Sequence, residues 1–271
     1  MASWGLSNPL ADIAVLRFSP ITLTAIECSV GFLFLACIRM VSSKSPRPKI
    51  KWRYLWWIGA LQPFAAWMLG NYGYKSATAS TGVIILSSEA IFSLFIARLW
   101  LSHKIPSQAF FSIFLGVVGV ALAAGGSLAL GGGSGAVYFL FSALLFGIYS
   151  AGMRKYLMNE DPFTVAFAQT GVSTFLALIV LVAFHPHFGG APIHVWVAAI
   201  SSGIFGVGLP FVAFNFLSGQ LSSKVTGSAL NLIPVAGVAA SALLGRGIPT
   251  AIQTMGGVLV LISIWGVSRT Q

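Results

Sequence analysis

Three carboxyl side chains, those of Asp12, Glu27 and Glu89, lie inside long apolar stretches of the sequence. An ionised carboxylate at the centre of a membrane-crossing helix costs about 2.5–3.5 kcal/mol, so such a group normally faces protein or a water-filled cavity. Low dielectric favours its protonated form, whereas a nearby cation or water favours the charged form. Each of the three is therefore a candidate for exchanging a proton for a bound solute. The alternative is a protonated side chain bonded to a neighbouring Ser or Asn.

The stretch around Glu89 organises this interpretation. Residues 80–101 are long and apolar enough to cross a bilayer as one helix, and Glu89 lies near their middle. A second stretch, residues 224–245, carries Asn231 and Pro234 at the comparable depth. We expect these two helices to face each other across a substrate path.

Aromatic and amide side chains recur at helical spacing in two further stretches. An Asn inside a membrane either holds neighbouring helices together or faces a ligand. Because both stretches combine an Asn with aromatic rings, we expect an aromatic-walled pocket suited to a small amphipathic organic molecule. The predicted substrate-binding residues are Trp67, Asn71, Tyr74, Glu89, Tyr149, Phe211, Asn215 and Asn231.

Three prolines, Pro63, Pro210 and Pro234, fall inside apolar stretches. A proline removes one backbone hydrogen bond and kinks the helix that contains it. Such a point is a candidate hinge for alternating access, and a static kink is the alternative.

Residues for other chemistry are scarce. Cys28 and Cys37 form no zinc or nucleophile motif. Histidines at positions 185, 187 and 194 share one loop, where a solvated role is favoured over metal binding. No histidine lies at membrane depth, which argues against most intramembrane enzymes. We expect no catalytic residue, no metal and no cofactor.

Composition places the chain in a membrane. Of the 271 residues, 57% are hydrophobic and 7% are charged, against about 25% charged in a soluble domain. The formal net charge of +10 would suggest nucleic acid in a soluble protein. Here the basic residues lie at the ends of apolar runs, so they indicate orientation in a bilayer instead.

Ten apolar runs are candidate membrane-crossing helices, separated by short segments rich in Pro and Gly. They cover residues 3–18, 20–41, 55–75, 78–101, 107–128, 135–153, 162–184, 193–218, 224–245 and 249–267. With a cytoplasmic N-terminus, twelve of the 15 Lys and Arg residues fall on the cytoplasmic side and three on the outer side. This bias predicts that both termini are cytoplasmic.

The two halves of the chain resemble each other. Shifting the sequence by 144 residues brings Asn71 onto Asn215, and a shift of 142 brings Ser19-Pro20-Ile-Thr22 onto Asp161-Pro162-Phe-Thr164. Five runs in each half, 1–130 and 131–271, mean that the second half enters the membrane from the opposite side. Inverted repeats typically place a substrate site near the midplane between the halves.

Several short motifs support a family resemblance: Trp4-Gly5 with Ser7-Asn8, Ser19-Pro20, Leu86-Ser-Ser-Glu89-Ala90, Asn231-Leu-Ile-Pro234, Leu244-Gly245 and Gly256-Gly257. In these motifs the chain resembles the EamA type of the drug/metabolite transporter superfamily over nearly its whole length. The resemblance implies an all-α integral membrane protein with ten transmembrane helices in two inverted five-helix repeats. The chain departs from the family pattern at Ala90, which replaces a proline, and at Ser102-His103 and Gly245-Arg246, which replace a Gly-Glu pair. The first apolar run is also shorter than in the family.

The function expected from these features is secondary active transport. The chain would move small organic metabolites, amino-acid-like or drug-like, across the inner (plasma) membrane by alternating access. No nucleotide-binding GxxxxGK loop is present, so an ion gradient is the expected energy source. The resemblance implies export, and the carboxyl groups inside apolar runs favour protons as the coupled ion. The alternatives are an uncoupled exchanger or permease, an intramembrane enzyme, a channel and a non-transporting scaffold. The expected partners are a small-molecule substrate and the lipid bilayer, without nucleic acid, in a monomer or alternatively a dimer.

Overall fold

The computed structural model describes residues 1–41, 52–101, 107–129, 133–186, 190–220 and 232–270, and every regular element in these ranges is a helix. In chain order the elements are α1 (Ala2–Ala14), α2 (Pro20–Val41), α3 (Trp52–Gly59), η1 (Ala60–Ala65), α4 (Ala66–Tyr74), α5 (Ala79–Leu86), α6 (Glu89–Leu101), α7 (Ser107–Ala129), α8 (Gly133–Tyr156), α9 (Pro162–Phe184), α10 (Ile193–Ser202), η2 (Gly203–Gly208), α11 (Leu209–Gln220), α13 (Leu232–Leu243) and α14 (Ala251–Thr270). The segments η1 and η2 are short π-helical turns that join the helices on either side.

Within the described ranges, five helical stretches are each long and apolar enough to cross a bilayer: Pro20–Val41, Ala79–Trp100, Gly133–Tyr156, Pro162–Phe184 and Ile193–Leu217. Three shorter apolar helices accompany them, Phe111–Ala123, Leu232–Leu243 and Ala251–Gly266. Large apolar side chains such as Leu33, Phe111 and Val182 are exposed on the outside of the bundle. Apolar surface of this kind is stable against lipid chains, so the all-α membrane class expected from the sequence is confirmed.

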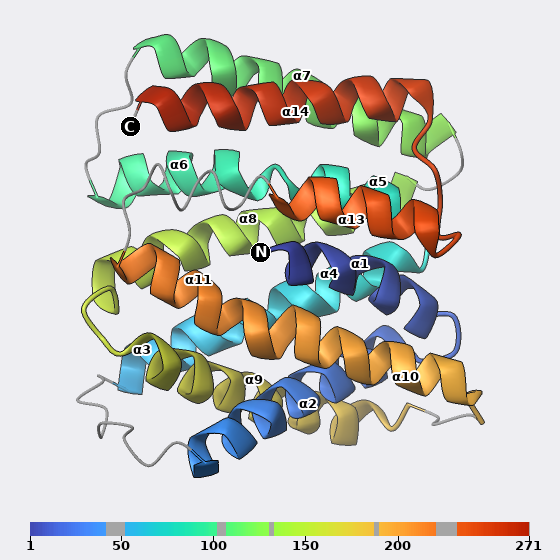
Figure 1. Ribbon diagram of the computed structural model, residues 1–271, viewed down its shortest axis with the longest axis vertical. Helices are drawn as coiled ribbons and strands as arrows, with labels where there is room; N and C mark the ends of the chain where they lie inside the picture. Colours follow the sequence, from blue (N-terminus) through green and yellow to red (C-terminus); the bar gives the residue numbers. More distant parts are fainter. Residues whose placement is uncertain (42–51, 102–106, 130–132, 187–189, 221–231, 271) are drawn as a thin grey trace.

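Corresponding helices of the two halves lie antiparallel. α2 packs against α9 and α7 packs against α14, and the sequence colours run in opposite directions along each pair (Figure 1). α1 packs against α13 and α10, whereas its counterpart α8 packs against α6 and α4. The halves therefore exchange equivalent contacts, as expected for inverted repeats. The α7–α14 pair forms one end of the molecule in Figure 1, and α2, α3 and α9 form the other.

The matched helix starts have the same local cause. The hydroxyl of Ser19 accepts a hydrogen bond from the backbone N–H of Thr22 at 3.0 Å, and the carboxylate of Asp161 accepts one from that of Thr164 at 2.8 Å. In both segments the proline that follows the cap is the first residue of the helix. A capping side chain followed by proline is a preferred helix start, because proline lacks the N–H that would otherwise stay unsatisfied there.

Glycines let the backbones of paired helices touch. A Cβ atom added at Gly119 of α7 would lie 2.6 Å from the carbonyl oxygen of Gly256 in α14, and one at Gly256 would lie 2.5 Å from that of Gly119. Likewise, a Cβ at Gly5 of α1 would lie 2.7 Å from the backbone nitrogen of Gly237 in α13. Small residues permit this close approach, which van der Waals packing within a bilayer requires.

The helical stretch that contains Glu89 has a local turn that the sequence did not predict. A turn at Ser87 and Ser88 separates α5 from α6. The Ser87 hydroxyl donates a 2.8 Å hydrogen bond to the carbonyl of Val83, and the Ser88 hydroxyl donates a 2.7 Å bond to that of Ile85. Serine hydroxyls that bond to the preceding turn compete with the helical pattern and bend helices. Ala79–Trp100 still forms one helical stretch long enough to cross a bilayer, as expected, with a local irregularity at Ser87 and Ser88 after which Glu89 begins α6.

Candidate functional site

A cavity of about 70 Å³ lies between helices of both halves. Its walls come from α1, α4, α5, α6, α8, α10, α13 and α14. The volume is enough for only a few water molecules, so the space is narrow in this conformation. The polar side chains that line it are Ser7, Asn8, Asn71, Ser87, Glu89, Ser142 and Ser202.

Aromatic rings form much of the remaining wall. Trp4 and Trp67 stack with ring centroids 6.0 Å apart, and Phe146 meets Trp4 edge-on at 5.4 Å. Tyr74 completes the aromatic lining. Phe211 is fully buried behind Trp4, at 5.2 Å between centroids, and does not line the cavity. Of the residues predicted to bind substrate, Trp67 and Tyr74 line the cavity, whereas Phe211 packs behind the wall residue Trp4.

Glu89 is the single charged side chain among the described residues that line the cavity. It is half-buried in the first turn of α6, where the helix dipole favours a negative charge. Among the described residues, no hydrogen bond or ion pair engages its carboxyl group. A carboxyl group without such a partner, facing a narrow space between aromatic rings, is suited to a cationic group on a ligand or to a proton.

Glu27 lies behind the cavity wall and joins the two halves. Its fully buried carboxylate accepts a 2.8 Å hydrogen bond from the amide of Asn71 in α4 and a second bond from the hydroxyl of Ser202 in α10. The Asn71 amide also donates to the hydroxyl of Thr24, at 3.0 Å. Asn71 and Ser202 line the cavity and Glu27 does not. Glu27 therefore contacts a bound molecule only through these two side chains.

Several residues that line the cavity were not predicted to bind substrate, among them Asn8 and Ser202. Asn8 accepts a hydrogen bond from the hydroxyl of Tyr74, and its own amide donates to the carbonyl of Trp4 at 3.0 Å. Trp4, Asn8 and Ala11 recur at helical spacing on the cavity face of α1. This spacing is the feature of the sequence that could have identified Asn8 as a cavity residue. Ser202 has no such feature, because its role depends on a carboxylate from a distant helix.

A second polar network lies outside the cavity. The hydroxyl of Tyr149 donates to the side-chain oxygen of Asn215 at 3.2 Å, and the amide of Gln169 donates to Tyr149 at 3.3 Å. Gln169 also donates to the backbone carbonyl of Gln62, at 3.3 Å. Tyr149 and Asn215 are thus placed away from the cavity, although they were predicted to bind substrate. The equivalent network in the first half of the chain, around Asn71, contains Glu27 at the position that Gln169 occupies here.

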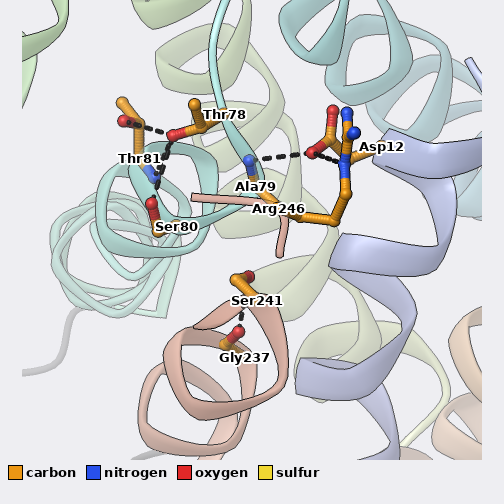
Figure 2. A network of polar contacts seen from close by, with 8 residues as sticks. All are labelled: Asp12, Thr78, Ala79, Ser80, Thr81, Gly237, Ser241 and Arg246. Atoms are coloured by element: carbon orange, nitrogen blue, oxygen red, sulfur yellow. Dashed lines mark hydrogen bonds and ion pairs between the residues drawn. The ribbon is translucent and has the colours of Figure 1, made fainter. Parts of the chain in front are cut away.

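Asp12 takes part in an ion pair. Its carboxylate lies 2.9 Å from Nε of Arg246 and accepts a 3.3 Å hydrogen bond from the backbone N–H of Ala79, the first residue of α5 (Figure 2). Arg246 follows α13, so the pair joins α1, α5 and the second half of the chain. The Asp12 side chain is 3% exposed and does not line the cavity. These contacts favour a structural role over proton coupling.

The three prolines predicted as hinges lie in different helical segments. Pro63 lies in η1, Pro210 lies just beyond η2, and Pro234 lies in α13 and lines the cavity. η1 and η2 begin 143 residues apart, so each half has a π-helical turn at the equivalent position. Pro63 lies within the first of these turns and Pro210 lies just after the second. Asn231 lies outside the described residues. In the described ranges, no group of three or more His, Cys, Asp or Glu side chains could hold a metal.

Comparisons with known proteins agree with this arrangement. A model of the EamA-like transporter family matches residues 1–125 and again residues 133–269. The chain is 24% identical over 217 residues to a probable terminal-alkyne amino-acid exporter of Streptantibioticus cattleyicolor, covering 78% of this chain and 71% of that protein. It is 25% identical over 268 residues to an uncharacterized protein of Pseudomonas aeruginosa, covering 94% and 87%.

A solved crystal structure of a protein shares the fold. It has a TM-score of 0.72 and 16% sequence identity, and the match covers 98% of this chain and 93% of that chain. The family match covers nearly the whole sequence and both halves. The chain therefore belongs to the EamA-like transporter family.

Proposed function

We propose that the protein is a secondary active transporter for small organic molecules that carry an amino group, and that it exports them by alternating access in exchange for protons. The observation that carries this proposal is the carboxyl group of Glu89, which has no partner among the described residues and lines a narrow, aromatic-walled cavity between the two halves. A carboxylate and aromatic faces both attract an ammonium group. The amides of Asn8 and Asn71 supply hydrogen-bonding groups beside it.

The substrate class and the direction of transport are supported by a relative. One similar protein is named as a probable terminal-alkyne amino-acid exporter, and amino acids combine an amino group with a small organic side chain. The cavity would have to widen to hold such a molecule, since its present volume is about 70 Å³. Widening on one face at a time is what alternating access requires, and the helix irregularities at Pro63, Pro210 and Pro234 are the proposed hinges.

Among the three membrane carboxyl groups, Glu89 is the one that we assign to coupling. Asp12 is paired with Arg246, and Glu27 is held by two hydrogen-bond donors behind the wall. Glu89 alone is both unpartnered within the described residues and in contact with the cavity. It could therefore bind either a proton or an ammonium group without first breaking a contact.

We place the transporter in the inner (plasma) membrane with both termini in the cytoplasm, on the distribution of basic residues. The proposed repeats are residues 1–130 and 131–271. One chain encloses the cavity, so a monomer suffices for transport. No cofactor and no catalytic residue enter this proposal.

The test is flux through the purified protein in proteoliposomes. A panel of labelled amino acids and amines should include solutes whose movement requires both the protein and a pH gradient. Glu89→Gln should abolish the gradient-dependent component. The matched control is Glu27→Gln, which we expect to keep it, because the Ser202 hydroxyl can rotate to accept a hydrogen bond from the new amide. If the gradient-dependent flux is unchanged in Glu89→Gln, the role of Glu89 in coupling is refuted. If solute flux through the natural protein is the same with and without the pH gradient, an uncoupled exchanger is favoured.

A further inference from the structure

A second hollow, larger than the central cavity, lies on the outside of the bundle between α13 and α14. Its volume is about 290 Å³, roughly four times that of the cavity. The walls are almost entirely hydrocarbon, including Ile84, Val235, Val238, Val258 and Leu261. Val235 and Val258 are 56% and 49% exposed, so the groove opens toward the lipid side of these helices.

The groove and the cavity share a wall. Ser87 and Pro234 line both spaces, and they therefore form the partition between them. Ser87 lies in the turn that interrupts α5 and α6, and Pro234 lies in α13, where it provides no N–H for a helical hydrogen bond. The Ser87 hydroxyl is bonded to Val83 of its own helix. Among the described residues, no hydrogen bond joins α13 to residues 84–90.

We infer that this groove is a side entrance through which the apolar part of an amphipathic amine reaches the cavity from the bilayer, while its amino group binds at Glu89. The inference rests on the proposed function and adds a substrate class and a route to it. Continuity with the cavity supports it, since the two spaces are separated by Ser87, in the turn between α5 and α6, and by Pro234, in the first turn of α13. Moving that partition breaks no hydrogen bond between α13 and the α5–α6 turn.

The chemistry of the groove selects this occupant. Ser87 and Thr254 supply its polar side chains, and Ser87 is already bonded within its helix. A peptide would bring backbone groups that the groove could not satisfy, at a cost of several kcal/mol for each group within the bilayer. The phosphate of a phospholipid head group would need cations, and no Lys or Arg lines the groove among the residues that the structure describes. A hydrocarbon chain that enters the groove from lipid gives up no hydrogen bond and exchanges one apolar environment for another.

Two substitutions narrow the groove from opposite sides. Ala239→Trp acts from α13, where Ala239 is exposed and lines the groove. Gly257→Leu acts from α14, where a Cβ atom would lie 3.5 Å from Ile84, an ordinary contact. Ala121→Trp is the matched control, because Ala121 is exposed on α7 and does not line the groove. All three variants should elute from size exclusion like the natural protein.

The probes are tetramethylammonium and trimethyl(octyl)ammonium, which share a fixed positive charge and differ in the apolar chain. In proteoliposomes, both groove variants should reduce protein-dependent flux of the octyl compound about tenfold, which corresponds to a barrier about 1.4 kcal/mol higher, because the bulkier side chain obstructs the path of the octyl chain. Flux of tetramethylammonium through the two groove variants should not change. In the control variant Ala121→Trp, the flux of both probes should match that of the natural protein. Equal loss of both probes, or loss of neither, would overturn the side entrance and leave the transporter assignment intact. If the natural protein carries neither cation, both the amine preference and this inference fail.

Discussion

At the scale of single residues, the proposed function depends on which carboxyl group has no partner among the described residues. Asp12 is neutralised by Arg246, and Glu27 accepts hydrogen bonds from Asn71 and Ser202. A bound carboxylate of this kind holds helices together, because removing one partner leaves a buried charge unsatisfied. Glu89, beside the cavity, is the group that remains available to a ligand.

The charge of the ligand should decide binding. No Lys or Arg lines the cavity within the described residues, so Glu89 should attract a cation and repel an anion. Tyramine, tyrosine and 3-(4-hydroxyphenyl)propionate share a ring and differ in charge. Calorimetry on the purified protein should show tyramine binding about tenfold or more tightly than the propionate, as expected for one charged hydrogen bond. Glu89→Gln should remove most of this difference. Equal affinity for the three compounds would contradict the role of Glu89.

At the scale of helices, the sequence predicted the elements better than the contacts. Apolar runs report a membrane-crossing helix locally, and the run at 162–184 coincides with α9. The turn at Ser87 and Ser88 was missed because serine is also common within helices. Partners such as Arg246 for Asp12 were missed because 234 residues separate them. Spacing along one helix cannot identify a partner that folding alone brings near.

The contact between α7 and α14 should be sensitive to a single methyl group. Gly256→Ala places a Cβ atom 2.5 Å from the carbonyl oxygen of Gly119, so the two backbones must separate. We expect a loss of about 1–3 kcal/mol in stability, the usual cost of overpacking. Gly257→Ala is the neighbouring control, because its Cβ would lie no closer than 3.5 Å to Ile84. Thermal unfolding in detergent should show a lower midpoint for the first variant only, and equal midpoints would argue against close packing.

The ion pair that joins α1 to the second half should also contribute to stability. Arg246→Gln leaves the buried carboxylate of Asp12 without its cation, and we expect a cost of about 2 kcal/mol. This is below the 3–5 kcal/mol typical of a fully buried pair, because the Arg246 side chain is 25% exposed. Asp12→Asn combined with Arg246→Gln should cost less than the sum of the single changes. Additive changes in thermal unfolding would show that the pair contributes no coupling energy.

At the scale of the whole molecule, two antiparallel sets of helices enclose one cavity from which charge is almost absent. The two networks behind it are equivalent in position and different in chemistry, since one contains Glu27 and the other Gln169. The repeat in the sequence predicted this pairing of positions. It could not predict that Tyr149 and Asn215 would lie outside the cavity, because their exclusion depends on how aromatic side chains from several helices pack.

The basic residues predict how the whole molecule is oriented in the membrane. Lys155 at the end of α8 donates to the backbone carbonyl of Trp100 in α6, and Arg39 near the end of α2 lies 4.8 Å from the centroid of the Phe167 ring. Cations beside aromatic rings are typical of the membrane interface, and an excess of Lys and Arg marks the cytoplasmic face. These ends of α2, α6 and α8 lie on one side of the bundle (Figure 1), which should therefore be cytoplasmic.

Reporter fusions can test this orientation directly. Green fluorescent protein fused after residue 271 should fluoresce, because it folds in the cytoplasm, whereas alkaline phosphatase fused at that position should be inactive. Fused at Gly190, in the exposed segment between α9 and α10, alkaline phosphatase should be active and the fluorescent protein dark. The two sites act as controls for each other, because they must report opposite sides of the membrane. The reversed pattern would place the basic residues outside, and the same result at both sites would contradict the number of crossings between them.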